Sequence, residues 1–201
     1  MQIVCLDLEG VLMPEIWRAL ADDTGIGELT RTTRDEPDYN ILMRQRLKIL
    51  REHHISIQDI HRTIASMEPL DGAALFLESL RRERQLIILS DTFYSFIDSF
   101  MKKLAYPTIF CNDLIIDSQG VIQDYALRKE NAKADAVAAL QSMNFTVFAA
   151  GDSYNDITMI QQADRACFFR APESILKEYS TIPAFIDYEN LLNYICGTEQ
   201  E

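Results

Sequence analysis

Short apolar runs alternate along the chain with longer stretches that have helical periodicity. Four of these runs are too short for typical helices, and each is followed by polar or turn residues. They predict buried strands at residues 3–8, 86–90, 145–151 and, with the weakest pattern, 166–169. Residues 108–128 have the pattern of a hairpin that turns at Ser118–Gly120.

The stretches between these strands predict helices from Asp71, around 94–104 and from Asn131. Asp71 and Asn131 have side chains that suit N-cap positions. Strands that alternate with helices indicate a parallel sheet with helices on its faces. We therefore expect an α/β fold with a Rossmann-like parallel sheet core.

The interval between the first two predicted strands is unusually long. Asp7 and Ser90 are 83 positions apart (90 − 7), whereas a βαβ unit takes about 30 residues. The surplus predicts helices at about 15–24, 38–54 and 56–66, the last with Ser56 as its N-cap. We expect a core domain of residues 1–11 and 69–201 and an inserted helical domain of residues 12–68. An insertion there lies over the sheet edge where parallel α/β proteins bind ligands.

Polar side chains follow three of the predicted strands and are expected to meet at that edge. They are Asp7 and Glu9, then Ser90 and Asp91, then Asp152, Asn155 and Asp156. An Asp at a strand end is also a common helix N-cap, and for Asp152 alone both interpretations stand. Several carboxylates side by side require a cation between them, and Mg²⁺ is commonly held by one or two carboxylates, water and substrate phosphate.

Asp7 and Glu9 suit two different chemical tasks. An unperturbed Asp has a pKa of about 3.9, so Asp7 is expected to be ionised at neutral pH and able to act as a nucleophile. Attack on phosphorus would give an aspartyl-phosphate. Glu9 would protonate the leaving alcohol and then deprotonate the incoming one, which requires a raised pKa or a short-lived protonated state.

Composition excludes some classes of partner. The chain has 31 acidic and 19 basic residues, a net charge of −12, which argues against nucleic acid because that partner needs a dense basic surface. No apolar stretch approaches the roughly 20 residues that span a membrane, and no targeting signal is expected. Four widely spaced cysteines predict free thiols in the cytoplasm: Cys5, Cys111, Cys167 and Cys196.

Four segments in this order, "DLEGV", "LSDTF", a downstream Lys and "GDSYND", resemble the motifs of the haloacid dehalogenase superfamily of phosphotransferases. The resemblance covers nearly the whole chain, and the helical insertion resembles that superfamily's cap. More narrowly, the chain resembles the phosphoserine phosphatase branch that also transfers phosphate to homoserine. The resemblance implies an Mg²⁺-dependent enzyme that acts on phosphoserine, with homoserine as the second small-molecule substrate of that branch.

By this resemblance Asp7 is the nucleophile and Glu9 the general acid and base. Mg²⁺ would be held by the carboxylates of Asp7 and Asp152 and by the main-chain oxygen of Glu9. The resemblance also implies that phosphate or substrate is contacted by Ser90, Asp91, Lys133 and Asn155, with Asp156 orienting this group.

Two features depart from the superfamily's usual pattern, and one assignment stays open. The superfamily usually has a second Asp where this chain has Glu9, and it often has Thr where this chain has Val11. The longer Glu9 side chain leaves the position of the general acid open. Lys133 has two neighbours that could replace it, Arg128 and Lys129, and a Lys in the first turn of a helix is usually a solvated surface residue.

The inserted region offers a separate indication of the substrate. On the predicted helix 38–54, Arg46 lies within the apolar stripe, because its neighbours one turn away are apolar. It either snorkels at the edge of that stripe or points into a closed site to bind a carboxylate. Glu15 has two interpretations. It would bind an ammonium group, or it is an acidic residue that only stabilises the first turn of a helix. Together they would recognise the two charged ends of an amino acid.

Other function classes share parts of this pattern. A receiver domain of signalling also has a phosphoacceptor Asp, a Ser or Thr and a Lys on a parallel sheet, but it is shorter and lacks an inserted domain. A phosphatase for another small phosphorylated metabolite and an inactive binding relative are further alternatives. A homodimer is expected only because homodimers are common.

Overall fold

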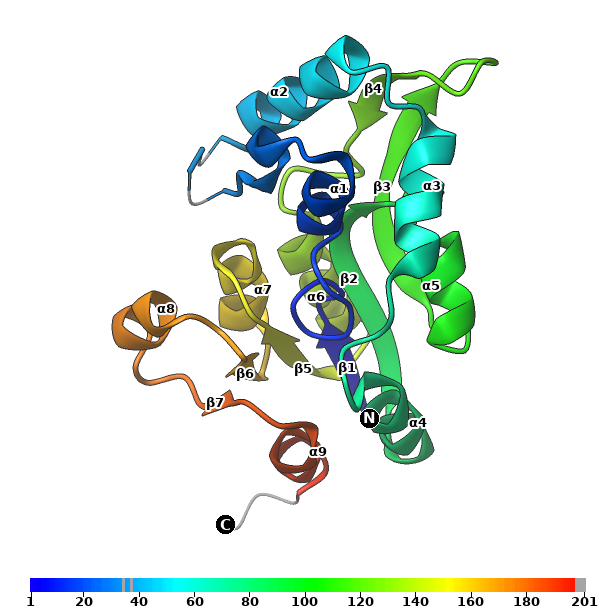
Figure 1. Cartoon of the computed structure of the whole chain (residues 1–201). Helices are drawn as coiled ribbons and strands as arrows, with labels where there is room; N and C mark the ends of the chain where they lie inside the picture. Colours follow the sequence, from blue (N-terminus) through cyan, green and yellow to red (C-terminus); the bar gives the residue numbers. More distant parts are fainter. Residues whose placement is uncertain (34, 37, 198–201) are drawn as a thin grey trace.

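The computed structural model describes residues 1–33, 35–36 and 38–197, and Figure 1 shows their arrangement. A sheet of seven strands has the order β4-β3-β2-β1-β5-β6-β7. Its strands are β1 (Gln2–Leu6), β2 (Gln85–Phe93), β3 (Ile109–Ile116), β4 (Ile122–Ala126), β5 (Thr146–Gly151), β6 (Arg165–Phe169) and β7 (Ala184–Phe185). All neighbours pair in parallel except β3 and β4, which form the predicted hairpin. The predicted α/β fold is confirmed.

Helices cover the sheet and connect its strands. The helices outside the inserted region are α4 (Ala73–Glu83), α5 (Asp98–Lys103), α6 (Ala132–Ser142), α7 (Ile157–Gln162), α8 (Glu173–Glu178) and α9 (Tyr188–Cys196). On β1, Val4 and Leu6 pack into the largest apolar cluster while Ile3 and Cys5 pack into a second one. This alternation places apolar side chains on both faces of β1, as expected for a strand at the centre of a covered sheet.

Three helices and a 3₁₀ turn lie between β1 and α4. They are α1 (Ile16–Thr24), η1 (Gly27–Thr30), α2 (Tyr39–Glu52) and α3 (Ile57–Ser66), close to the helices predicted from sequence. Figure 1 shows α1 and α2 beyond the carboxyl ends of β1 and β2, and α3 beside β3 and next to α5. α2 begins after Asp38, whose carboxylate accepts hydrogen bonds from the backbone N–H groups of Asn40 and Ile41.

Several predicted boundaries were wrong. The first strand ends at Leu6 rather than Leu8, because the chain turns back and both Leu12 and Met13 donate backbone hydrogen bonds to the Leu8 carbonyl. β2 instead continues through "SDTF" to Phe93. The helix predicted around 94–104 is split into the 3₁₀ turn η2 (Tyr94–Phe96) and α5.

The predicted N-caps had mixed outcomes. Ser56 caps α3 as predicted. Asp71 was wrong as an N-cap, because the cap of α4 is Gly72, whose φ of 86° is in the left-handed region that glycine adopts without strain. Asn131 occupies the N-cap position of α6, but its side chain makes no capping hydrogen bond.

In the part of the chain that the structure describes, no helix is long and apolar enough to cross a membrane. The four cysteines are free, and burial raises the pKa of Cys5 to about 12.

The capping box at the start of α3 gives a test of the fold. Ser56 Oγ accepts a hydrogen bond from the Asp59 backbone N–H, while the Asp59 carboxylate accepts one from the Ser56 backbone N–H at 2.7 Å. We expect Ser56→Ala to lower the free energy of unfolding by about 1 kcal/mol, because the Asp59 backbone N–H loses its acceptor and the Asp59 carboxylate loses the hydrogen bond from Ser56 Oγ. Urea denaturation measures this change.

Ser142→Ala is the matched control, because Ser142 Oγ only donates to the Ala139 carbonyl in the last turn of α6. This control should leave the free energy of unfolding nearly unchanged. Equal losses in the two variants would mean that the capping box does not stabilise α3.

Candidate active site

Three neighbouring strands bring the predicted site residues together at one edge of the sheet. Asp7 follows β1, Ser90 and Asp91 lie near the end of β2, and Asp152 follows β5, and β1 pairs with both other strands. Asp7 continues the ladder, since its backbone N–H donates to the Ala150 carbonyl at 3.0 Å. The convergence predicted from the parallel order is therefore present.

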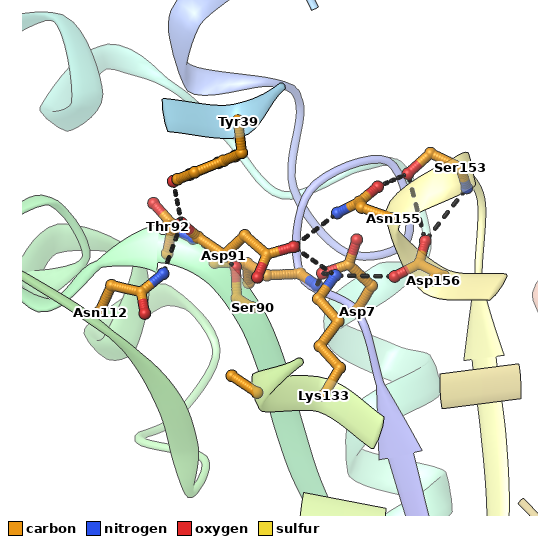
Figure 2. A network of polar contacts seen from close by, with 12 residues as sticks. Asp7, Tyr39, Ser90, Asp91, Thr92, Asn112, Lys133, Ser153, Asn155 and Asp156 are labelled. Carbon is orange, nitrogen blue, oxygen red and sulfur yellow. Dashed lines mark hydrogen bonds and ion pairs between the residues drawn. The ribbon is translucent and has the colours of Figure 1, made fainter. Parts of the chain in front are cut away.

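A buried ammonium lies at the centre of this acidic group (Figure 2). Lys133 Nζ is 2.7 Å from Asp156 Oδ1, 3.0 Å from Asp7 Oδ1 and 3.5 Å from Asp91 Oδ2. Lys133 and Asp7 are each only 4% exposed, and Asp156 is fully buried. A buried charge of one sign is stable only when it is paired, so the ammonium and the carboxylates depend on one another.

The charges shift the pKa values of Lys133 and Asp7. Burial by itself lowers the pKa of Lys133, but the carboxylates of Asp156, Asp7 and Asp91 outweigh it and raise that pKa well above its usual value. Burial and the charge of Asp156 raise the pKa of Asp7, and Lys133 opposes them. Lys133 therefore offsets only part of the rise in the pKa of Asp7, although a nucleophile needs the ionised form of this carboxyl group.

The two alternatives to Lys133 lie elsewhere. Lys129 Nζ is 2.9 Å from the exposed carboxylate of Asp135. Arg128 donates to the Ala132 carbonyl and lies over the Phe110 ring, 5.1 Å from its centroid. Of the three candidates, Lys133 alone is within ion-pair distance of Asp7. It lies in the first turn of α6 as predicted, but that turn faces the sheet edge rather than solvent.

Asp156 is held by the turn after β5. Its Oδ2 accepts hydrogen bonds from the backbone N–H groups of Asp152 at 3.0 Å and Ser153 at 3.1 Å, while its Oδ1 accepts from Lys133. A side chain at Gly151 would overlap the Asp156 carboxyl group. These contacts explain the "GDSYND" segment: the glycine makes room, and Asp156 fixes both the turn and the ammonium.

The loop after Asp7 approaches this turn closely. Gly10 has a φ of 79°, and a Cβ atom there would overlap the Asp152 carboxyl group. Glu9 points away from the lysine: its Oε2 accepts a hydrogen bond from the Ile16 backbone N–H at 2.9 Å, at the start of α1. Burial raises the pKa of Glu9, although the bond from Ile16 opposes this shift. A raised pKa is what a general acid at neutral pH requires.

The carboxylates can also hold a metal ion. One oxygen each of Asp7, Asp152 and Asp156 lies within 4.8 Å of the others. Three hard oxygen donors fit a divalent cation such as Mg²⁺. Asp7 and Asp152 were predicted as ligands from the sequence, whereas the carboxylate of Asp156 was predicted only to orient them. The Glu9 main-chain oxygen stays a predicted ligand.

A cavity of about 210 Å³ extends from Asp7 and Ser90 to the inserted helices. Glu9, Glu15 and Arg46 also line it, so both residues proposed to read an amino acid face the same space as the proposed nucleophile. Arg46 is 8% exposed, and burial lowers its pKa to about 10. Its Nη2 donates to the Arg31 carbonyl at 2.7 Å.

Asp91 and Asn155 connect the two sides of the site. Asn155 Nδ2 donates to Asp91 Oδ2 at 2.8 Å. The Asp91 carbonyl accepts hydrogen bonds from Tyr39 at 3.2 Å and Asn112 at 3.1 Å (Figure 2).

Ser90 is buried, and its Oγ accepts a hydrogen bond from the Thr92 backbone N–H at 3.2 Å. Of the residues predicted from sequence, all line the cavity except Lys133 and Asp156, which are buried and pair with each other beside Asp7.

Sequence reasoning missed several residues of this cavity. Thr92 also lines it, and it follows "SD" directly, so its place in the motif was a usable signal. Trp17, Tyr39 and the threonines at 30, 32 and 33 come from the inserted region. For these residues the pattern of apolar positions gives no signal, because their role depends on how that region folds over the sheet.

The comparisons with known proteins agree with this geometry. A family model described as haloacid dehalogenase-like hydrolase matches residues 1–164. The chain therefore belongs to the haloacid dehalogenase-like hydrolases.

Two relatives and one solved structure refine the comparison. Phosphoserine phosphatase ThrH of Pseudomonas aeruginosa is 49% identical over 191 residues, which are 95% of this chain and 93% of that protein. A phosphoserine phosphatase of Pseudomonas syringae pv. tomato is 46% identical over 190 residues, 94% of this chain and 80% of that protein. A phospho-aspartyl intermediate analogue of a phosphoserine phosphatase has the same fold, with a TM-score of 0.79, 22% identity and coverage of 96% and 98%.

Removal of the buried ammonium tests the site's electrostatics. We expect Lys133→Ala to lower kcat by about 100- to 1,000-fold, because a cation at the reacting group is lost. Without Lys133 the pKa of Asp7 rises further above its unfolded value, so the folded state binds more protons than the unfolded state. In metal-free buffer the variant's stability should therefore fall as pH rises above about 4.

Lys129→Ala removes an exposed lysine four positions away and serves as control. In this control, kcat from steady-state kinetics and the pH dependence of the thermal unfolding temperature should both be the same as in the wild type. Similar losses in both variants would contradict the special position of Lys133.

Proposed function

We propose that the protein is a phosphatase that hydrolyses O-phospho-L-serine through an aspartyl-phosphate on Asp7. One observation carries the proposal: Asp7, paired with Lys133, shares a cavity with Arg46 and Glu15. The cavity thus contains a nucleophile that can attack phosphorus, and two charged side chains that can bind the carboxylate and the ammonium of an amino acid. The names of the two relatives at 49% and 46% identity support the same substrate.

In the first step an Asp7 carboxylate oxygen attacks phosphorus, and the bond from phosphorus to the serine oxygen breaks. Glu9 gives its proton to the departing oxygen, which leaves as the serine hydroxyl. Lys133 is close enough to Asp7 to neutralise charge on the phosphoryl oxygens. Ser90 would bind the phosphoryl group, and Asp91 and Asn155 would contact the substrate beside it.

In the second step a water molecule attacks the phosphorus of the aspartyl-phosphate. Glu9 takes a proton from that water, inorganic phosphate forms, and the Asp7 carboxylate is released. Glu9 is therefore protonated again and ready for the next cycle. A divalent cation held by the carboxylates of Asp7 and Asp152 and the main-chain oxygen of Glu9, with the Asp156 carboxylate close by and Mg²⁺ the ion we propose, would neutralise phosphoryl charge and favour the ionised form of Asp7.

Substrate selection is assigned to the inserted region. The Arg46 guanidinium would bind the serine carboxylate, and Glu15 the ammonium. Residues 12–68 would act as a cap domain over the core of residues 1–11 and 69–201. One contact that would hold this cap in place is the hydrogen bond from Tyr39 on α2 to the Asp91 carbonyl on β2. Closure over the substrate would exclude water other than the attacking molecule.

Further expectations stay predictions. Homoserine would be a second acceptor if it takes the place of water, and would then give O-phosphohomoserine. A homodimer and a cytoplasmic location also stay predictions, the latter supported by four free cysteines. Membership of the hydrolase family favours an enzyme over a receiver domain, and a different phosphorylated metabolite is the remaining alternative.

The proposed substrate is tested by Arg46→Ala. We expect the KM for phosphoserine to rise about 100-fold, because the carboxylate loses a charged hydrogen-bond partner, while the KM for p-nitrophenyl phosphate stays nearly constant. Initial rates of phosphate release at several concentrations of each substrate give the two KM values. A panel of phosphorylated metabolites, with and without homoserine, then tests the choice of substrate and of acceptor. Equal effects on the two substrates would mean that Arg46 does not bind the carboxylate.

The metal requirement gives an independent test. Treatment with EDTA should abolish phosphate release, and added Mg²⁺ should restore it, because the clustered carboxylates need a divalent cation to accept an anionic substrate. Isothermal titration of Mg²⁺ into the metal-free protein should show binding that Asp152→Asn weakens. Turnover that is indifferent to EDTA would contradict the proposed cation site.

A further inference from the structure

The Arg46 guanidinium is held by partners that leave part of it unused. Its Nη2 donates to the Arg31 carbonyl at 2.7 Å, and its Nη1 is 3.8 Å from the Met43 sulfur, a weak acceptor. Its Nε is buried and has no hydrogen-bond partner among the residues that the structure describes. A buried donor without a partner is costly, so it marks a place where a ligand acceptor is expected.

The guanidinium of Arg46 lies over the ring of Trp17. The Arg46 Cζ atom is 4.5 Å from the ring centroid, within the range of a cation–π contact. Trp17 lies in the first turn of α1, and its ring and Arg46 line the same cavity as Asp7. No carboxylate forms an ion pair with Arg46 in the part of the chain that the structure describes.

Trp17 is itself fixed from the other side. Its ring meets the ring of Phe96 edge to face, with centroids 5.9 Å apart and an interplanar angle of 69°. Phe96 is 2% exposed and also contacts Phe93, at the end of β2. A chain of three aromatic rings therefore runs from the central sheet to the guanidinium of the inserted region.

From this arrangement we propose that Trp17 is a specificity-determining residue that positions Arg46 for the carboxylate of the substrate. The inference rests on the proposed function, since it concerns how that site tells an amino acid from other phosphate esters. The ring fixes the plane of the guanidinium and blocks one of its faces. The free N–H groups at its edge are then oriented before the substrate arrives, which reduces the entropy lost on binding.

Charge supports the same assignment. Burial lowers the pKa of Arg46 to about 10, although Tyr39, Glu9 and Glu15 oppose this shift. A substrate carboxylate would add an anion at hydrogen-bond distance from the guanidinium. An aromatic ring leaves that position open, whereas an acidic side chain in the same place would compete with the substrate.

The experiment compares phosphoserine with O-phosphoethanolamine, which has the same phosphate and ammonium groups but no carboxylate. The readout is the ratio of the two kcat/KM values. We expect Trp17→Leu to lower this ratio about tenfold, which corresponds to about 1.4 kcal/mol, through a higher KM for phosphoserine at nearly constant kcat. Trp17→Phe keeps an aromatic face and should retain most of the ratio.

A double-mutant cycle separates positioning from general destabilisation. If Trp17 acts through Arg46, Arg46→Ala combined with Trp17→Leu should discriminate no worse than Arg46→Ala alone. Additive losses would overturn the inference. If Arg46→Ala loses discrimination and Trp17→Leu keeps it, the inference about Trp17 fails while the proposed function stands.

A measurement on the unmodified chain covers the case in which Trp17→Leu does not fold. Trp17 is the chain's single tryptophan, so intrinsic fluorescence excited at tryptophan reports on this position alone. With Mg²⁺ present and the emission read by stopped flow before the first turnover, phosphoserine should change the emission and O-phosphoethanolamine should change it much less. Equal responses would overturn the inference. If the wild type neither responds to phosphoserine nor prefers it as substrate, the proposed function itself fails.

Discussion

The ion cluster around Lys133 is the interaction on which the rest of the site depends. One buried ammonium lies within 3.5 Å of three carboxylates that come from after β1, from β2 and from the turn after β5. Such a cluster is stable only if every charge has its partner, so it fixes three separate chain segments relative to one another. It also leaves an excess of negative charge, which explains why a divalent cation and an anionic phosphoryl group can both be accommodated there.

Backbone constraints make that cluster possible. Gly10 and Gly151 allow the loop after β1 and the turn after β5 to approach the carboxyl groups of Asp152 and Asp156, where any side chain would overlap them. Glu9 is directed instead toward the start of α1 and the inserted region. The two acids of "DLEGV" therefore do not share one environment. Both acids line the cavity, but Asp7 pairs with the lysine while Glu9 accepts a hydrogen bond at the start of α1, which matches the separate roles proposed for them.

Apolar periodicity was sufficient to predict the parallel core, the hairpin and the inserted helices, because each of these follows from local pattern and interval length. It failed where tertiary contacts decide the conformation: the early end of β1, the extension of β2 through "SDTF", and the left-handed Gly72 that caps α4 in place of Asp71. The site residues were predictable from strand ends and motif order. Trp17 was not, because its importance lies in a contact with Arg46, 29 positions away (46 − 17).

Covalent attachment of the phosphoryl group to Asp7 is the central claim of the mechanism, and borohydride trapping tests it most directly. The enzyme would be mixed with phosphoserine and Mg²⁺, quenched within one turnover and treated with borohydride, which reduces an aspartyl-phosphate to homoserine. Peptide mass spectrometry should then find homoserine at position 7 in the wild type and no conversion in Asp7→Asn. Conversion at another aspartate, or phosphate release without any conversion, would contradict the mechanism.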